Sequence, residues 1–310
     1  MYRGYDFIPH GTRIDFVGWR RAALVFSVLV VLGSILAVLL LGLNLGIDFA
    51  GGILIEVKTE GAVSLGEMRA KLNALGVGEV ALQSVMNTDS PGDDSTMIIR
   101  LQQLEHVASV AQNTALLKVR EALGTAVSFR RTELVGPRVG RELVTSGLLA
   151  TVLAIIAISA YIWFRFEWQF GLGSMLALLH DVLATIGLFA VTQIEFNLAS
   201  VAAILTIAGY SVNDSVVVYD RVRENLRKYR KIPLDALLNR SLNETLSRTL
   251  LTSGTTALVV MAVLAFGGDV LQGFAIAMLW GLTVGTYSSI YIGIPVLLFL
   301  NVQRTTNEAM

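Results

Sequence analysis

Residues 22–43, AALVFSVLVVLGSILAVLLLGL, contain no charged side chain and only two serines among apolar residues and glycine. A helix that crosses a bilayer needs about 20 predominantly apolar residues in succession. Five later stretches share this character. The six stretches are 22–43, 145–164, 170–192, 197–219, 249–267 and 272–300. They are too long for strands and lack the polar face of a soluble helix, so the sequence predicts six transmembrane helices.

The composition supports a membrane protein. Of 310 residues, 54 % are hydrophobic and 15 % are charged, against roughly 25 % charged in soluble proteins. The chain has no cysteine, which excludes disulfides, zinc fingers, iron–sulfur clusters and thiol catalysis. Its three histidines are scattered, so no metal site or cofactor is expected, and its zero net charge gives no field that attracts nucleic acid.

The short basic segments predict the orientation of the helices. Segment 1–21 carries four Lys or Arg residues and segment 220–248 carries eight, whereas 193–196 and 268–271 carry none. Because short cytoplasmic loops are enriched in Lys and Arg, both termini are predicted to be cytoplasmic. The arm 1–21, the basic segment 220–248 and the tail 301–310 then lie inside a bacterial plasma membrane, and segment 44–144 lies outside.

The outside segment 44–144 has the length of one small domain. Alternating or β-branched runs predict strands, and Ser64 followed by Glu67 forms a capping-box signature at the start of a helix. Residues 87–94, NTDSPGDD, read as a turn. The strands are expected at 53–59, 79–86, 96–101 and 126–135, and the helices at 64–75 and 104–123. This β-α-β-β-α-β order predicts an α+β, ferredoxin-like domain between the first two transmembrane helices.

Ionisable residues within the predicted spans are the functional candidates, because charge in a bilayer is costly. Asp214 lies about five residues before the cytoplasmic end of the fourth span, and Arg248 enters the fifth span from the same side. A carboxyl group near an arginine stays ionised, whereas in apolar surroundings it prefers to be neutral. A helix moving between those two settings would bind and release a proton, so Asp214 and Arg248 are predicted to couple proton movement to helix movement. The alternative is a static Asp214–Arg248 ion pair that fixes helix packing.

Further polar residues are candidates for a proton path or for orienting these groups. Asn213 flanks Asp214, and Thr252 and Thr255 continue a polar stripe from Arg248. His180 and Asp181 lie near the middle of the third span, where one could bond locally while the other contacts a neighbouring subunit. The alternative is that these residues only contribute to the packing of the helices.

Enzymatic functions do not fit the sequence. An intramembrane aspartyl protease needs two facing carboxylates, and its G-x-G-D context is absent. No G-x-S-x-G motif and no Walker A sequence occur, so serine hydrolysis and ATP hydrolysis are not expected. We therefore expect no enzyme.

Six motifs distributed over nearly the whole chain resemble a known family. They are GIDFAGG at 46–52, VGPRVGREL at 135–143, LLHD at 178–181, AGYSVNDSVVVYDRVREN at 208–225, LNETLSRTLLTSGTT at 242–256 and FGGDVLQGFA at 266–275. Together they resemble the SecF branch of the SecD/SecF family of protein-export membrane proteins, within the resistance–nodulation–division superfamily.

The resemblance implies a function in protein secretion. A chain of this kind pairs with SecD, associates with the SecYEG channel and in many bacteria with YajC, and uses the proton-motive force to help a preprotein complete translocation. Asp214 and Arg248 match the family's proton-path positions. Two other functions remain open, a proton-coupled efflux subunit for small molecules and a static scaffold subunit. The short segments 193–196 and 268–271 argue against efflux, since they leave no second outside domain.

Overall fold

The computed structural model describes residues 12–59, 65–77, 79–85, 95–102, 109–124, 127–300 and 302. It divides into a helical unit, formed by the chain up to Asn44 and from Ala150 onward, and a sheet unit, Leu45–Leu149. The turn expected at 87–94, the capping residue Ser64, residues 1–11 of the arm and most of the tail lie outside the described residues.

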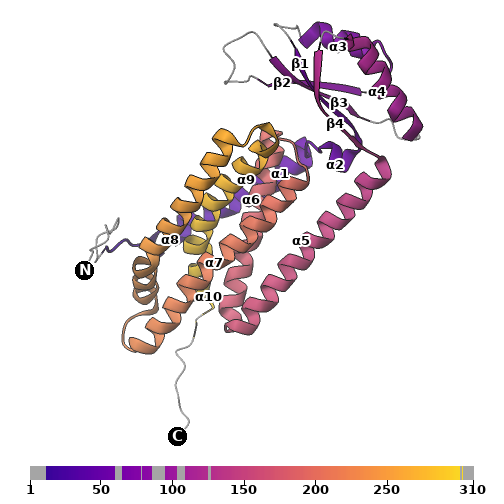
Figure 1. The fold of residues 1–310 in the computed structure, drawn as a ribbon. Helices are drawn as coiled ribbons and strands as arrows, with labels where there is room; N and C mark the ends of the chain where they lie inside the picture. The colour runs from indigo at the N-terminus through magenta and orange to yellow at the C-terminus, as the bar shows by residue number, and fades with distance from the viewer. Residues whose placement is uncertain are drawn as a thin grey trace. The chain divides into compact units, whose positions relative to one another are not determined.

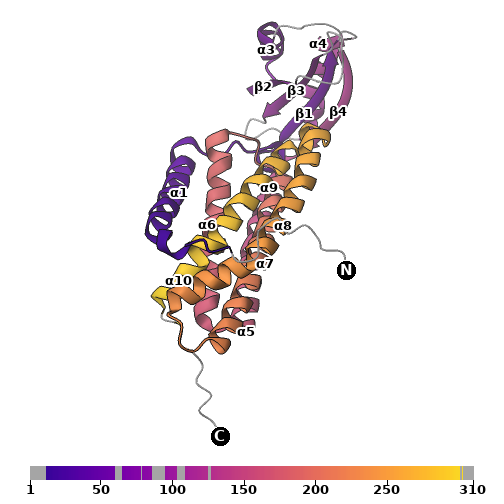
Figure 2. The same ribbon diagram turned by 90° about the vertical axis from the view of Figure 1, so that its left-hand side faces the viewer.

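Long helices build the helical unit (Figures 1 and 2). They are α1 (Arg20–Leu41), α5 (Pro137–Arg165), α6 (Trp168–Thr192), α7 (Leu198–Lys228), α8 (Leu234–Phe266) and α9 (Asp269–Ser288). A π-helical turn, Ser289–Gly293, and α10 (Ile294–Phe299) continue α9, so the α-helical geometry of this span is interrupted just before Pro295. Six helical segments in the described part of the chain are long and apolar enough to cross a membrane, in agreement with the six predicted spans.

The sheet unit has a four-stranded antiparallel sheet in the order β2-β3-β1-β4. Its strands are β1 (Gly52–Thr59), β2 (Glu79–Val85), β3 (Ser95–Gln102) and β4 (Val127–Val135). The helices α3 (Leu65–Asn73) and α4 (Ser109–Leu123) lie on one face of the sheet (Figure 1). The central strand β1 buries Ile53, Ile55 and Val57 in alternation, because successive side chains of a strand point to opposite faces.

A short helix, α2 (Ile47–Ala50), precedes β1 and was not expected from the sequence. Gly51 and Gly52 follow it with φ of 72° and 131°, a region that favours glycine. Gly140, in the first turn of α5, packs against α2: a side chain there would lie 3.0 Å from the carbonyl oxygen of Phe49. The motifs at 46–52 and 135–143 therefore meet at α2, where Gly140 allows close packing.

The predicted ends of the fourth and fifth spans are not helix ends. Helix α7 continues without a break to Lys228, and α8 begins at Leu234, well before the predicted span at 249. The basic segment 220–248 is therefore mostly the extensions of these two helices. Glu244 joins the extensions, since it accepts from Arg221 at 2.7 Å and from Asn225 at 2.8 Å.

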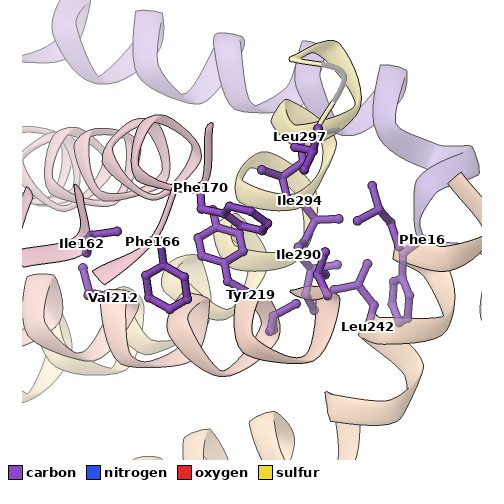
Figure 3. Close-up of a cluster of buried hydrophobic side chains, with 14 of the residues drawn as sticks. Phe16, Ile162, Phe166, Phe170, Val212, Tyr219, Leu242, Ile290, Ile294 and Leu297 are labelled. Atoms are coloured by element: carbon purple, nitrogen blue, oxygen red, sulfur yellow. The ribbon is translucent and has the colours of Figure 1, made fainter. Parts of the chain in front are cut away.

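The largest core of the helical unit gathers aromatic and branched side chains from α5, α6, α7, α8, the π-helical turn and α10 (Figure 3). Tyr219 is fully buried, with its ring edge-to-face with Phe166 and Phe170. Phe16 and Val17, from the segment before α1, also belong to this core, so the arm is held against the bundle.

Small residues allow the helices to approach closely. A side chain on Gly281 would lie 2.3 Å from Ile207, and one on Gly285 would lie 3.4 Å from Ser211. The Gly281-x-x-x-Gly285 pattern thus packs α9 on α7, as small residues do in membrane helices. Gly187 faces Ser34 of α1 in the same way.

Gly173 gives a test of this packing. A methyl group there would lie 2.8 Å from the Gly293 carbonyl oxygen and 2.8 Å from the Tyr219 hydroxyl, and a backbone carbonyl cannot rotate away. We expect Gly173→Ala to destabilise the protein by about 1–3 kcal/mol. Thermal unfolding in detergent measures this. Gly254→Ala is the control, since nothing lies within 4 Å of a methyl group there, and an equal loss in both variants would contradict the packing argument.

The arm before α1 is pinned to α8 by polar contacts. Asn243 Oδ1 accepts from the Ile14 amide at 2.9 Å, and Asn239 donates to Asp15 Oδ1 at 2.6 Å. The Asn239 hydrogen bond, helped by the Gly18 amide, lowers the pKa of Asp15 below its ordinary value of 3.8.

This lowered pKa predicts how the arm responds to acid. A group with a depressed folded-state pKa stabilises the fold above its unfolded pKa and loses that contribution as the pH falls through the folded value. We expect hydrogen-exchange protection of the Gly18 amide, relative to its intrinsic rate, to stay constant from about pH 8 to pH 5 and to fall only below the ordinary pKa of Asp15. A loss already between pH 7 and 5 would show that another group holds the arm.

Candidate proton-coupling site

The described residues of the helical unit include three buried Asp or His side chains, besides the buried phenol of Tyr219. Asp181 is fully buried on α6 beside His180, and Asp214 on α7 is 4 % exposed. Helices α6, α7 and α9 supply most of the buried surface of the bundle, whereas α1, α5 and α8 expose most of theirs. Both carboxyl groups therefore lie on the two helices that are covered on most sides, where each oxygen needs a donor from a neighbouring helix.

Asp214 has one satisfied and one free carboxyl oxygen. Its Oδ1 accepts a hydrogen bond from the Thr249 hydroxyl of α8 at 2.8 Å. Its Oδ2 is buried and has no hydrogen-bond partner. Burying an ionised carboxylate with one oxygen unpaired costs free energy. The neutral, protonated acid pays a smaller cost, so this setting favours the protonated form of Asp214.

Arg248 is near Asp214 without pairing with it. It precedes Thr249 on α8 and is exposed, and its charge acts on Asp214 across the helix interface. No ion pair joins Arg248 and Asp214 in the part of the chain that the structure describes. The static ion pair considered from the sequence is therefore not the arrangement found here.

The other residues proposed around Asp214 point elsewhere. Asn213 is exposed on α7 and makes no contact with Asp214 that would orient it. Thr252 and Thr255 are exposed and bond to their own helix, to the carbonyl oxygens of Arg248 and Leu251. Together with Arg248 they form an exposed polar stripe on α8, defined by Arg248, Thr252 and Thr255, rather than a path leading inward.

Asp181 is the centre of a second cluster, in which both of its carboxyl oxygens have partners. Its Oδ2 accepts from the hydroxyls of Ser211 on α7 at 2.6 Å and of Ser288 on α9 at 2.7 Å. Its Oδ1 lies 3.0 Å from His180 Nδ1, while His180 Nε2 is buried without a partner. His180 and Asp181 therefore do bond to each other. Both are buried within one chain, and the contacts that Asp181 makes are to helices of its own chain rather than to another subunit.

Two further hydroxyl contacts tie the same helices together. Ser215 and Ser289 lie 3.0 Å apart between α7 and the π-helical turn. Tyr210 donates to Ser253 at 3.1 Å, and Ser253 lies 2.9 Å from Thr286. Tyr210, Ser211 and Asp214 thus use different partners, although all three lie within one turn of α7.

Sequence reasoning missed Thr249, Ser288 and Ser289. Their only signal was a hydroxyl within an apolar span, which recurs many times in this chain. The described residues contain no group of three His, Asp or Glu side chains that could hold a metal ion. The arrangement can hold a proton: the Asp181 carboxyl group has two hydroxyl donors and the His180 ring as partners, whereas Asp214 has one oxygen without a partner.

Comparisons with known proteins place these residues in a family. A model described as "Protein export membrane protein SecD/SecF, C-terminal" matches residues 115–303, and one described as "SecD/SecF GG Motif" matches residues 37–63. The chain belongs to the SecD/SecF family. The GG motif is the α2–β1 junction with Gly51 and Gly52, and the larger match contains both buried carboxyl groups.

The similar proteins are SecF subunits. "Protein translocase subunit SecF" of Cereibacter sphaeroides is 44 % identical over 299 residues, covering 96 % of this chain and 92 % of that protein. The subunit of the same name from Rhodobacter capsulatus is 43 % identical over 309 residues, covering 97 % and 93 %. The resemblance to the SecF branch of the family is thereby confirmed, and the chain is a multi-pass membrane protein of a protein-export system.

The solved structures agree in fold. SecDF of Thermus thermophilus, described as a translocon-associated membrane protein, has a TM-score of 0.82 and 35 % identity over 94 % of this chain. A second structure, SecDF in a super-membrane-facing form, has a TM-score of 0.67 over 95 % of it. This chain spans about two fifths of the length of those SecDF chains, 39 % and 40 %.

Proposed function

We propose that this chain works as a proton-driven subunit that helps a preprotein complete its passage through the SecYEG channel, in partnership with SecD and, where present, YajC. The observation that carries the proposal is the environment of Asp214. One of its oxygens is bonded to Thr249 and the other is buried with no donor, on a helix otherwise held by hydroxyl contacts. Such a carboxyl group can gain a proton in one arrangement of the helices and lose it in another.

In the second arrangement of the helices, Arg248 would bind the Asp214 carboxylate. It is exposed in the present arrangement and lies one residue before the Thr249 that bonds Asp214. A modest rotation or shift of α8 relative to α7 would exchange the hydroxyl donor for a guanidinium, because adjacent residues on a helix are about 100° apart. The carboxylate would then be stabilised by charge, and its proton would leave.

The exposed polar stripe on α8 is evidence for an interface with a partner chain. Arg248, Thr252 and Thr255 are exposed where the rest of α8 presents Leu250, Leu251 and Leu258. Charge facing lipid is costly, so this stripe is better placed against another protein. SecD is the partner we propose. The structural relatives support this, because their SecDF chains are more than twice as long as this one.

The proposed topology follows the positive charge. Both termini and the extensions of α7 and α8 would be cytoplasmic, and the sheet unit would lie outside. Its element order and strand order, β2-β3-β1-β4, support a ferredoxin-like domain inserted between the first two transmembrane helices.

The free energy released by one proton is smaller than a complete conformational change requires, so the cycle would have to repeat. One proton moving through 100 mV releases about 2.3 kcal/mol. A full reversal of a two-state equilibrium, from 1:99 to 99:1, needs about 5.5 kcal/mol. One proton therefore biases the equilibrium without completing the reversal, and several protons would be used for each translocated chain.

The proposal is tested in vesicles that contain SecYEG, SecD and this chain, with a preprotein stalled late in translocation. Imposing a proton gradient should speed completion, and omitting the chain should remove the gradient-dependent part alone. Completion that is equally fast with and without the gradient would leave only the scaffold function. Drug-stimulated proton flux by this chain without SecD would instead support efflux.

A further inference from the structure

A cavity of about 530 Å³ opens between the end of α5 and the extension of α7. It is lined by Arg165, Asp220, Arg223, Glu224, Arg227 and Lys228. Cavities of this size hold small ligands in other proteins. It lies away from Asp214 along α7, and the proton-coupling proposal makes no use of it.

The cavity carries an excess of positive charge. Asp220 is already paired with Arg165 at 3.5 Å, and Glu224 is paired at 2.5 Å with Arg221, which does not line the cavity. Arg223, Arg227 and Lys228 have no carboxylate at ion-pair distance among the residues that the structure describes. Three cations thus face a space whose two acidic groups are engaged.

Two of the cations are held in place by an aromatic ring. The guanidinium groups of Arg165 and Arg223 lie 5.0 Å and 5.4 Å from the ring centre of Phe166, a core residue. Stacking on a ring orders a guanidinium and leaves its N–H groups free to donate. The two guanidinium groups repel each other, and Asp220, which pairs with Arg165, offsets only one of the two charges, so an added anion would be favourable here.

Exposed aromatic residues around the turn from α5 to α6 indicate how deep in the membrane this site lies. Trp163 is 66 % exposed, Phe164 is 94 % exposed and Trp168 is 50 % exposed. Arg165 lies between them in the chain. Aromatic side chains of this kind collect at the level of the lipid headgroups, and basic pockets beside transmembrane helices at the cytoplasmic side bind anionic headgroups.

We propose that this cavity binds the phosphate of an anionic phospholipid of the cytoplasmic leaflet, with Arg223, Arg227 and Lys228 as its ligands and Arg165 at its edge. The leaflet rests on the proposed orientation of the helices. Planar guanidinium groups bind phosphate oxygens through paired hydrogen bonds. The choline headgroup adds a cation to its phosphate, which the cations of the cavity repel, so the site prefers a lipid with net negative charge.

The test measures lipid binding by the purified chain in detergent, by native mass spectrometry, and does not depend on export. Phosphatidylglycerol and phosphatidylcholine with identical acyl chains are titrated separately. We expect the wild-type protein to bind phosphatidylglycerol at least tenfold more tightly, and Arg223→Gln with Arg227→Gln to reduce this preference to below threefold. The matched control is Arg230→Gln with Lys231→Gln, which removes the same charge from the next residues but not from the cavity lining.

Three results would overturn the proposal. They are equal affinities of the wild-type protein for the two lipids, an equal loss of preference in the control variant, and displacement of phosphatidylglycerol by millimolar inorganic phosphate, which would indicate a site for free phosphate. If the glutamine variant does not fold, Arg223→Lys with Arg227→Lys keeps the charge but not the paired donors. It should bind phosphatidylglycerol more weakly than the wild type does, and an unchanged affinity would contradict recognition by guanidinium groups.

Discussion

Replacing Asp214 with Asn should abolish the proton-gradient stimulation of late translocation while leaving the protein folded and assembled. Asn is nearly isosteric with the protonated acid, and its carbonyl oxygen can still accept from Thr249. The variant is therefore locked in the state that mimics the protonated form. We expect the rate of preprotein completion with a gradient to fall to the rate without one, measured in vesicles containing the complete complex.

The exposed neighbour provides the matched control. Asn213→Ala changes an adjacent amide that does not contact Asp214, so gradient stimulation should change by less than twofold. Thr249→Val is the informative companion, because it removes the hydroxyl donor at nearly constant volume. It should alter the pH at which stimulation is half-maximal without abolishing it. Normal stimulation in Asp214→Asn would exclude Asp214 as the proton carrier.

The second large effect is expected at Asp181, and there it concerns stability. Asp181→Ala removes the acceptor for Ser211 and Ser288 and the partner of His180, and leaves these buried groups unsatisfied. Hydrogen bonds between membrane helices contribute about 0.6–1.7 kcal/mol each. We expect a loss of about 2–4 kcal/mol and a fall in the unfolding temperature of roughly 5–15 °C.

Asp181→Asn separates the structural role from a proton-carrying role. An Asn oxygen can accept from both serine hydroxyls, and its amide can donate to His180, so the variant should keep most of the stability. Its gradient stimulation should also be close to that of the wild type, because the carboxyl group already has a full set of partners. Stable protein that has lost stimulation would instead place Asp181 and His180 on the proton path.

The positions of the spans could be predicted because their signal is local. A run of about 20 apolar residues is typical of a transmembrane helix. Alternation of apolar and polar residues indicates a strand in the same local way. The ends of α7 and α8 could not be predicted from the same signal. Charged residues after 219 indicate where the chain leaves the membrane. Both helices nevertheless continue beyond that point, and their extensions are joined where Glu244 accepts hydrogen bonds from Arg221 and Asn225.

The site was predictable in its ionisable members but not in their partners. Asp181, Asp214 and Arg248 stand out because charge in an apolar span is rare. Whether Arg248 or Thr249 faces Asp214 depends on a rotation of about 100°, which the packing of α8 on α7 decides. Likewise Ser211 and Ser288 reach Asp181 from helices that are 30 and 107 residues away in the chain, and their hydroxyls resemble many others in the sequence.

Proton flux during translocation tests the central claim most directly. In vesicles containing the complex, a pH-sensitive dye inside the lumen would report protons crossing as a stalled preprotein completes translocation. Our account predicts flux that accompanies completion in the wild type and none above background in Asp214→Asn, with Asn213→Ala unchanged. Equal preprotein-dependent flux in the wild type and in Asp214→Asn would contradict it.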